Sequence, residues 1–369
     1  MFDRGREKRS RTRVRVLVGA LAMSLVPIAA GSGTEAAVPA VSAPAKPAAI
    51  VAMGDSFISG EAGRWRGNSH QRRGDHEGTD LGREAYGPGG RCHRAIASPI
   101  TTAAPPGAVP INLACSGALV QHIDRIGPVP ELPRQIDQLR QVTQSFDVQT
   151  IALSIGGNDL GFEEMLRTCV FSFGDCSRRL DPLVEQRITP TTQQMILAVS
   201  AIQQTMRDAG DSDYRIVLIS YPKFTPAGAD NRVSEGLGRR LTGGCAVGNS
   251  DSAFFRYVVD RIAQEWATVA RRTGIEYLDM SWAFEGKQMC AKDVRYGSSR
   301  TQGEWTRGTI RWQNRGDDLY QEMFHPNVFG QEAIGDCLGQ VLQAGRGPFI
   351  CLNSGRNSTP SDMVLYYRT

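Results

Sequence analysis

Residues 49–60 read AIVAMGDSFISG, and this stretch decides the predicted fold. Its first part is a short, continuous apolar run that ends in Gly54-Asp55, which is typical of a parallel strand buried on both faces of a sheet. Further runs of this kind follow along the chain at 109–115, 148–156, 214–222 and 275–280. The sequence therefore predicts five buried strands.

Amphipathic segments separate these runs and are predicted to form helices. They lie at 132–146, 189–209, 252–273 and 331–343. In 252–273, apolar residues recur at helical spacing before Gly274, and glycine commonly ends helices. Strands that alternate with helices favour a parallel sheet covered on both faces. We therefore expect one α/β domain over 48–369, preceded by a short Ala/Pro/Ser-rich linker at 41–47.

Residues 1–40 are predicted to be a signal peptide. Basic residues crowd 1–15, an apolar run fills 16–30, and small residues follow, which is the order of an export signal. A retained membrane anchor is the alternative, but the apolar run contains Pro27 and is shorter than the roughly 20 residues that span a bilayer. We expect cleavage between residues 30 and 45, and a secreted protein with no integral membrane span in its mature form.

The charge of the whole chain comes from this leader. The net charge is +4, and residues 1–40 alone carry seven Lys and Arg against three Asp and Glu. The mature protein is therefore close to neutral, and its charge gives no support to nucleic acid as a partner.

Eight cysteines lie in the exported part of the chain, and an even number outside the cytosol predicts four disulfides. The sequence cannot choose among the many possible pairings. Joining neighbours in order is the expectation adopted here: Cys92–Cys115, Cys169–Cys176, Cys245–Cys290 and Cys337–Cys351. The chain contains no Cys-x-x-Cys pattern, and we expect neither a metal site nor a cofactor.

Ser56 directly follows the first predicted strand, at the edge of the sheet where open α/β folds bind ligands. At a helix N-terminus its backbone N–H is free to hold a developing oxyanion, and its hydroxyl is placed to act as a nucleophile. A helix cap is the alternative role, because serine is a preferred capping residue. This segment alone supports both interpretations equally.

A serine nucleophile needs a base, and His325 is the candidate. The other histidines, which fall in or near a long loop, are His70, His76, His93 and His122. His325 stands directly before the last predicted helix, and Pro326 restricts its backbone to extended or turn geometry. A surface histidine without a role is the alternative, so this segment alone does not identify a base.

Two further segments follow predicted strands. Gly117 lies in CSGA at 115–118, and Asn158 lies in GGND at 156–159. If the strands are parallel, both segments reach the sheet edge that holds Ser56. Glycine lets its N–H approach a ligand closely, and an Asn amide donates through its side chain. With the Ser56 N–H, these groups are predicted to form an oxyanion hole.

Four blocks of the sequence, taken in order, resemble those of the SGNH (GDSL) hydrolase family. They are GDSFISG (54–60), CSGA (115–118), GGND (156–159) and HPN (325–327). Each block alone is a weak signal, but all four, each after a predicted strand or before a predicted helix, are specific. They span nearly all of the mature chain.

The resemblance implies a role for each matched residue. Ser56 would be the nucleophile, Gly117 and Asn158 oxyanion donors, and His325 the general base. The family fold, a flavodoxin-like three-layer α/β/α sandwich with a mainly parallel sheet, agrees with the five predicted strands. The exported, cysteine-containing form is similar to secreted esterases and lipases of actinomycetes.

The chain departs from the family pattern at the residue that orients the histidine. Family members usually carry Asp three residues before it, and this chain has Glu322 there. Glu serves as the acid in other triads, so Glu322 is the preferred candidate, although it is one methylene longer. A backbone carbonyl, which would leave a Ser/His dyad, and Asp317 or Asp318 are the alternatives.

The expected function is hydrolysis of a small-molecule or lipid ester through an acyl-enzyme on Ser56. A carbohydrate O-deacetylase or a phospholipase A would use the same site. Acyl transfer to an alcohol and a non-catalytic binding module are alternatives of other classes. We expect a monomer, and the sequence does not indicate the acyl chain length.

Overall fold

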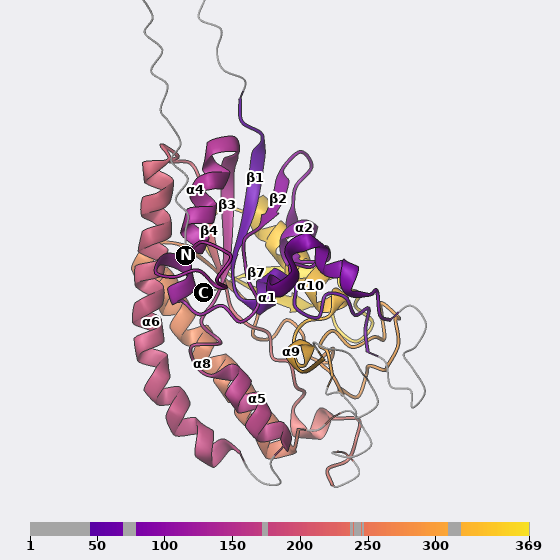
Figure 1. Cartoon of the computed structure of the whole chain (residues 1–369). Helices are drawn as coiled ribbons and strands as arrows, with labels where there is room; N and C mark the ends of the chain where they lie inside the picture. The colour runs from indigo at the N-terminus through magenta and orange to yellow at the C-terminus, as the bar shows by residue number, and fades with distance from the viewer. Residues whose placement is uncertain are drawn as a thin grey trace, which may run out of the picture. The chain divides into compact units, whose positions relative to one another are not determined.

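A mainly parallel sheet runs through the centre of the computed structural model (Figure 1). The structure describes residues 45–68, 79–171, 176–236, 239, 245, 247–308 and 319–368. Within these residues the sheet has seven strands in the order β2-β1-β3-β4-β5-β6-β7. They are β1 (Ala48–Gly54), β2 (Val109–Asn112), β3 (Asp147–Ser154), β4 (Arg215–Ile219), β5 (Glu276–Asp279), β6 (Pro348–Asn353) and β7 (Met363–Tyr367). β1 to β6 run parallel, and β7 pairs antiparallel with β6.

Helices cover both faces of the sheet, which makes three layers (Figure 1). The α-helices are α1 (Ser56–Ser59), α2 (Pro99–Ala103), α3 (Gln121–Asp124), α4 (Gln135–Ser145), α5 (Phe162–Phe171), α6 (Ser177–Asp208), α8 (Asn249–Thr273), α9 (Leu319–Glu322) and α10 (Val328–Gln343). Short 3₁₀ segments lie at Arg83–Cys92 and Gly228–Asp230. One apolar cluster packs α4, α6 and α8 against the sheet, and a second packs α2 and α10 against the other face.

The alternation of side chains along β1 builds these two clusters. Val51 and Met53 belong to the cluster under α6 and α8, and Ile50 and Ala52 belong to the cluster under α10. All four are buried, because a central parallel strand is covered on both faces. The apolar run that predicted this strand is thus explained by burial of the strand on both faces. The predicted flavodoxin-like three-layer fold is confirmed.

The prediction of a five-stranded sheet is wrong, because β6 and β7 extend it to seven strands. β1 to β5 coincide with the five predicted runs. β6 and β7 lie at the end of the sheet, and several of their residues are only partly buried. PFICLN is bounded by a proline and an asparagine, and MVLYY is only five residues long, so neither is a long apolar run of the kind that marks a central strand such as β1 or β3.

The predicted start of a helix at residue 189 is also wrong. α6 begins at Ser177 and continues through Pro182 and Pro190. Proline removes a backbone donor from a helix interior, but the Thr191 hydroxyl donates to the Arg187 carbonyl near the interruption. Buried apolar residues on both sides of Pro190 also hold the helix against the sheet.

Four disulfides join Cys92–Cys115, Cys169–Cys176, Cys245–Cys290 and Cys337–Cys351. These are the neighbour-in-order pairs. Cys92–Cys115 ties the end of the Arg83–Cys92 segment to the loop after β2, close to Gly117. Cys337–Cys351 ties α10 to β6.

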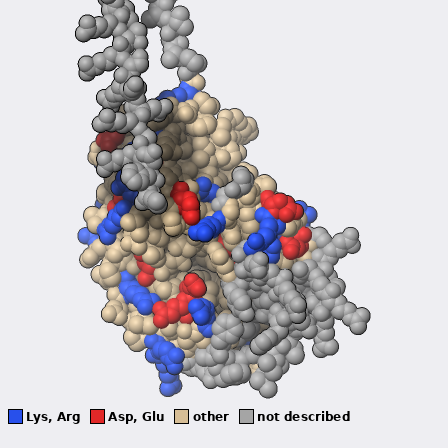
Figure 2. Space-filling model, in the orientation of Figure 1, with Lys and Arg blue, Asp and Glu red and all other residues tan. Residues whose placement is uncertain are grey.

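Acidic and basic side chains lie beside one another on the face drawn in Figure 2. None of the helices in the described part of the chain is long and apolar enough to cross a membrane. The expected signal peptide and nearly all of the expected linker lie outside the described residues.

Candidate active site

The turn after β1 places Ser56 at the carboxyl edge of the sheet. Gly54 has φ +130°, and a Cβ there would lie 1.8 Å from the carbonyl oxygen of Ser154 on β3. Only glycine therefore fits this crossing. The Asp55 side chain then accepts the Phe57 N–H at 3.1 Å and caps α1. Asp55, not Ser56, is the helix cap, so the Ser56 hydroxyl is left for another partner.

A buried glutamine holds the same turn in place from the side. Gln135, at the start of α4, accepts the Gly54 N–H at 2.7 Å and donates to the Gly54 carbonyl at 2.8 Å. One side chain thus contacts both backbone groups of Gly54 at the strand end, where the Gly54 carbonyl also accepts the Cys115 N–H at 3.0 Å. Sequence reasoning did not single out Gln135, because its partner lies 81 positions away.

Ser56 and His325 meet directly. His325 Nε2 lies 2.7 Å from Ser56 Oγ, and His325 Nδ1 lies 3.0 Å from the carbonyl oxygen of Met323. A carbonyl only accepts, so Nδ1 carries the proton and Nε2 presents its lone pair to the serine hydroxyl. Burial lowers the pKa of His325, while the Glu61 carboxylate and the Met323 carbonyl act in the opposite direction.

The prediction that Glu322 orients His325 is wrong in this structure. Its carboxylate accepts hydrogen bonds from Trp65 Nε1 at 2.6 Å and Tyr86 OH at 2.5 Å, and it pairs with Arg64 Nε at 2.8 Å. Burial raises the pKa of Glu322 against these contacts. Glu322 ends the short α9, which turns its side chain to the 61–86 segment, and the Met323 carbonyl takes the Nδ1 position. Asp317 and Asp318 lie outside the described residues.

The two predicted oxyanion segments lie beside the Ser56 turn and are tied together. Asn158 Nδ2 donates to the Ala118 carbonyl at 3.0 Å, and the Asp159 carboxylate accepts the Val120 N–H at 3.0 Å. Burial raises the pKa of Asp159 to about 6. Gly117 has φ +77°, and no atom lies within 4 Å of the position of a Cβ there. The space beside Gly117 is therefore open.

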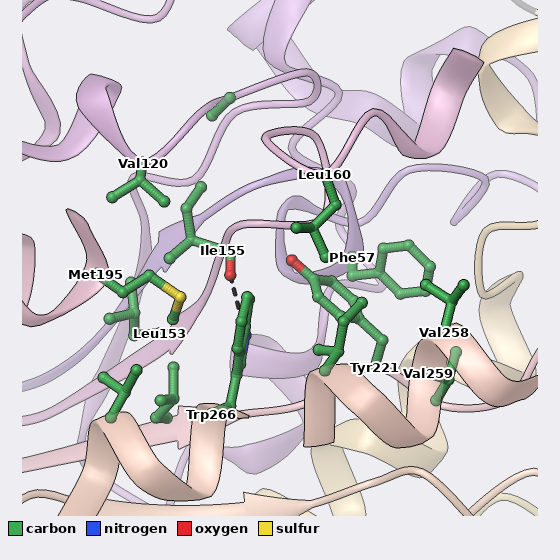
Figure 3. Close-up of a cluster of buried hydrophobic side chains, with 14 of the residues drawn as sticks. Phe57, Val120, Leu153, Ile155, Leu160, Met195, Tyr221, Val258, Val259 and Trp266 are labelled. Atoms are coloured by element: carbon green, nitrogen blue, oxygen red, sulfur yellow. Dashed lines mark hydrogen bonds between the residues drawn. The ribbon is translucent and has the colours of Figure 1, made fainter. Parts of the chain in front are cut away.

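The loop that carries Asn158 packs on a cluster of buried hydrophobic side chains, which includes Phe57, Tyr221 and Trp266 (Figure 3). Trp266 of α8 donates from Nε1 to the Ile155 carbonyl at 3.1 Å, which is the dashed contact in the figure. A Cβ on Gly156 would come within 2.5 Å of the Trp266 ring. The glycine in this loop thus permits a close approach to the indole, and Trp266 supports the loop from below.

A hydrogen-bonded chain links this loop to the Ser56 turn. Tyr221, after β4, accepts the Gly157 N–H at 3.0 Å and donates to the Asp55 carboxylate at 2.5 Å. Asp55 is fully buried, and burial raises its pKa to about 7. The segments that follow β1, β3 and β4 are therefore held as one unit.

Two hollows adjoin Asn158, and the smaller one also adjoins Ser56. A small apolar cavity of about 10 Å³ is lined by Ser56, Asn158, Phe57, Phe162, Tyr221 and Phe224, among others. A larger groove of about 740 Å³ is lined by Gly117, Asn158 and polar residues of α5, among them Glu163, Glu164 and Arg167. Asn158 lines both hollows, so one amide faces a narrow apolar space and a wide polar one.

Possible metal ligands gather at one place in the described part of the chain, in Cys169, Cys176 and Asp251. The two cysteines form a disulfide, and the Asp251 carboxylate accepts the Cys176 N–H at 3.0 Å. This cluster offers a single carboxylate and lies apart from Ser56 in the fold, so it adds no metal chemistry to the site.

Comparison with known families decides the class of this site. Residues 52–333 match the model of the GDSL-like lipase/acylhydrolase family. The chain belongs to this family. It is accordingly a serine ester hydrolase of the GDSL class, and the match spans all four sequence blocks.

Relatives from streptomycetes are similar over most of their length. A lipase of Streptomyces rimosus is 28% identical over 282 residues, which cover 74% of this chain and 84% of that protein. Lipase 1 of Streptomyces coelicolor is 28% identical over 320 residues, which cover 85% of this chain and 94% of that protein. Among solved structures, phospholipase A1 of Streptomyces albidoflavus aligns with a TM-score of 0.47 at 18% identity, over 81% of this chain and 100% of that chain.

Proposed function

We propose that this GDSL hydrolase cleaves a carboxylic ester through an acyl-enzyme on Ser56, with His325 as the general base. The observation that carries the proposal is the 2.7 Å contact between His325 Nε2 and Ser56 Oγ. In the attack, Oγ bonds to the ester carbonyl carbon while Nε2 takes the hydroxyl proton. His325 then gives this proton to the leaving alcohol, and water releases the acid by the same steps in reverse.

The proposed site is a dyad whose histidine is oriented by the backbone. The Met323 carbonyl accepts Nδ1–H and so selects the tautomer that a base requires. A carbonyl dipole stabilises the imidazolium less than the negative charge of a triad acid would, but the Met323 carbonyl occupies the position beside Nδ1 that such an acid takes. Glu322 has no part in this step.

Three donors are proposed to stabilise the oxyanion: the N–H groups of Ser56 and Gly117 and the amide of Asn158. The amide has two N–H bonds, and only one is used by the Ala118 carbonyl. The second is available to substrate. Donors fixed in advance by the protein stabilise the transition state without reorganisation at the moment of reaction.

The substrate is proposed to be a lipid or short-chain ester, in line with the relatives named lipases. The polar groove with Glu163, Glu164 and Arg167 favours a second candidate, an ester whose alcohol or head group is polar, as in a carbohydrate O-deacetylase or a phospholipase A. The apolar cavity beside Ser56, at about 10 Å³, has room for about one water molecule, so it does not indicate the size of the acyl group. Acyl transfer would differ only in having an alcohol replace water.

The protein is proposed to act outside the cytosol as a monomer, after removal of a signal peptide within residues 1–45. Four disulfides in the described residues support this location, because such bonds persist in oxidising compartments. Mass spectrometry of the mature N-terminus would test the cleavage, and light scattering would test the monomer.

Hydrolysis of p-nitrophenyl esters from C2 to C16 tests the enzymatic proposal. Ser56→Ala should abolish turnover, and Ser59→Ala is the matched control. Ser59 lies in the same short helix, is buried, and donates to the Ser56 carbonyl rather than to His325. Wild-type activity in Ser56→Ala, or equal loss in both variants, would contradict the proposal.

A further inference from the structure

A buried carboxylate that the proposed mechanism does not use lies beside the site. Glu61 is 0% exposed. Its oxygens contact His93 Nδ1 at 2.9 Å, Ser116 Oγ at 2.5 Å and Gln321 Nε2 at 3.1 Å. An isolated buried charge is costly. These contacts offset that cost and hold the Glu61 carboxylate in one position.

The partners of Glu61 come from the three segments that form the proposed site. The Glu61 N–H donates to the Ser56 carbonyl at 3.1 Å, which ties it to the nucleophile turn. Ser116 directly precedes Gly117 in the oxyanion loop. Gln321 lies four residues before His325, and its amide also donates to Ser116 Oγ at 2.9 Å.

A second glutamine reinforces the link to the histidine loop. Gln331 is fully buried, and its Nε2 donates to the Glu61 carbonyl at 3.1 Å and to the Pro326 carbonyl at 3.0 Å. Pro326 follows His325 directly. Glu61 is therefore linked, through side-chain and backbone contacts, to residues on both sides of His325 in the sequence.

The charges around Glu61 favour its ionised form. Burial acts to raise the pKa of Glu61, but the hydrogen bond from His93 and the charges of His325 and His93 lower it below its usual range. His93 itself stacks on Tyr86, with ring centroids 4.3 Å apart. Glu322 pairs with Arg64 and accepts a hydrogen bond from Tyr86 OH, and the negative charge of Glu61 contributes to the raised pKa of Glu322.

We propose that Glu61 is a positioning residue that joins the nucleophile turn, the oxyanion loop and the histidine loop. Its carboxylate also supplies the negative charge that faces His325, a charge the Met323 carbonyl lacks. When His325 takes the Ser56 proton, the imidazolium that forms is stabilised by this charge across the cluster. The inference rests on the proposed Ser56–His325 mechanism.

Glu61→Gln removes the charge and keeps the shape of the side chain. We expect kcat to fall by about 10- to 100-fold, because small misplacements of catalytic groups lower the rate by this order. KM should change little. Without the carboxylate the pKa of His325 falls, so the acidic limb of the kcat/KM profile should move to lower pH. A merely structural residue would not move this limb.

The matched control is Glu276→Gln. Glu276 is also a buried carboxylate, and it pairs with Arg215 at the opposite edge of the sheet. This variant should lose stability but keep the wild-type kcat and pH profile of its folded fraction. A folded Glu61→Gln protein with wild-type kcat, or with an unshifted acidic limb, would overturn the proposal.

If Glu61→Gln does not fold, Ser116→Ala tests the positioning role of Glu61 instead. It removes only the hydroxyl that joins Glu61 to the oxyanion loop, and kcat should fall by up to about tenfold with the acidic limb in place. Wild-type kcat in Ser116→Ala would overturn the proposal. Labelling of wild-type Ser56 by a fluorophosphonate separates the two claims: no labelling refutes the proposed mechanism, whereas equal labelling rates in wild type and Glu61→Gln refute only the role of Glu61.

Discussion

Replacing Asn158 by Ala should nearly abolish turnover while leaving the protein folded. The side-chain amide donates to the Ala118 carbonyl at 3.0 Å, and a neutral hydrogen bond of this kind contributes about 1 kcal/mol to stability. Loss of one oxyanion donor raises the barrier by about 2.7–4 kcal/mol, which lowers kcat roughly 100- to 1000-fold. The catalytic effect should thus exceed the effect on stability by about three- to fourfold in free energy.

The assay measures kcat and KM with a p-nitrophenyl ester, and urea unfolding measures stability in parallel. KM should change little, because the oxyanion contact strengthens only in the transition state. The Asp159–Val120 bond still ties the two loops together in the variant. A folded Asn158→Ala protein that keeps more than about a tenth of wild-type kcat would refute the assignment of Asn158 as an oxyanion donor.

Three further predictions test other contacts. Glu322→Gln should lower the free energy of unfolding by up to about 3–5 kcal/mol, because the buried Arg64 loses its partner at 2.8 Å and keeps the more distant Asp80, at 3.8 Å. The kcat of the folded fraction should fall less than about tenfold, and a loss near ten-thousandfold would restore Glu322 as a triad member. Removal of the Cys92–Cys115 disulfide by a double Ala substitution should destabilise the protein by about 3 kcal/mol and lower kcat; unchanged kcat would show that the bond does not brace the Gly117 loop. The pKa of Asp55 is raised from 3.8 to about 7, so the folded state favours the protonated carboxyl, and the contribution of Asp55 to stability should fall as pH rises from about 4 to 7. Asp55→Asn should flatten this part of the curve of unfolding free energy against pH. An unaltered slope would count against this role of Asp55.

The parts of the fold that could be predicted from sequence are mainly those buried most uniformly. The runs that became β1, β3, β4 and β5 are apolar because helices cover both faces of the sheet there. β2 is an edge strand with no buried residue, and it was predicted because its apolar run continues into the buried Leu113, Ala114 and Cys115. β6 and β7 escaped prediction because they lie at the other end of the sheet and are only partly buried.

Some residues of the candidate site could likewise be predicted from the sequence, and others could not. Ser56, Gly117, Asn158 and His325 could be named as candidates because each sits next to a predicted strand end or helix start and the four occur in a family order. The position of Glu322 could not be predicted, because spacing from His325 does not reveal that Arg64 and its neighbours bind the carboxylate.

Residues that act through distant contacts left no local pattern. Gln135 bonds to Gly54 across 81 positions, and Gln321 bonds to Glu61 across 260. Nothing around either glutamine distinguishes it from an ordinary helix residue. Such contacts are created by the packing of loops at the carboxyl edge of the sheet, which a single sequence does not specify.

Peptide mapping by mass spectrometry after reaction with a fluorophosphonate tests the central claim most directly. We expect one adduct, on the peptide that contains Ser56, formed at a rate that falls sharply in His325→Ala. An adduct on another serine, or labelling of Ser56 at the same rate without His325, would contradict a Ser56 nucleophile activated by His325.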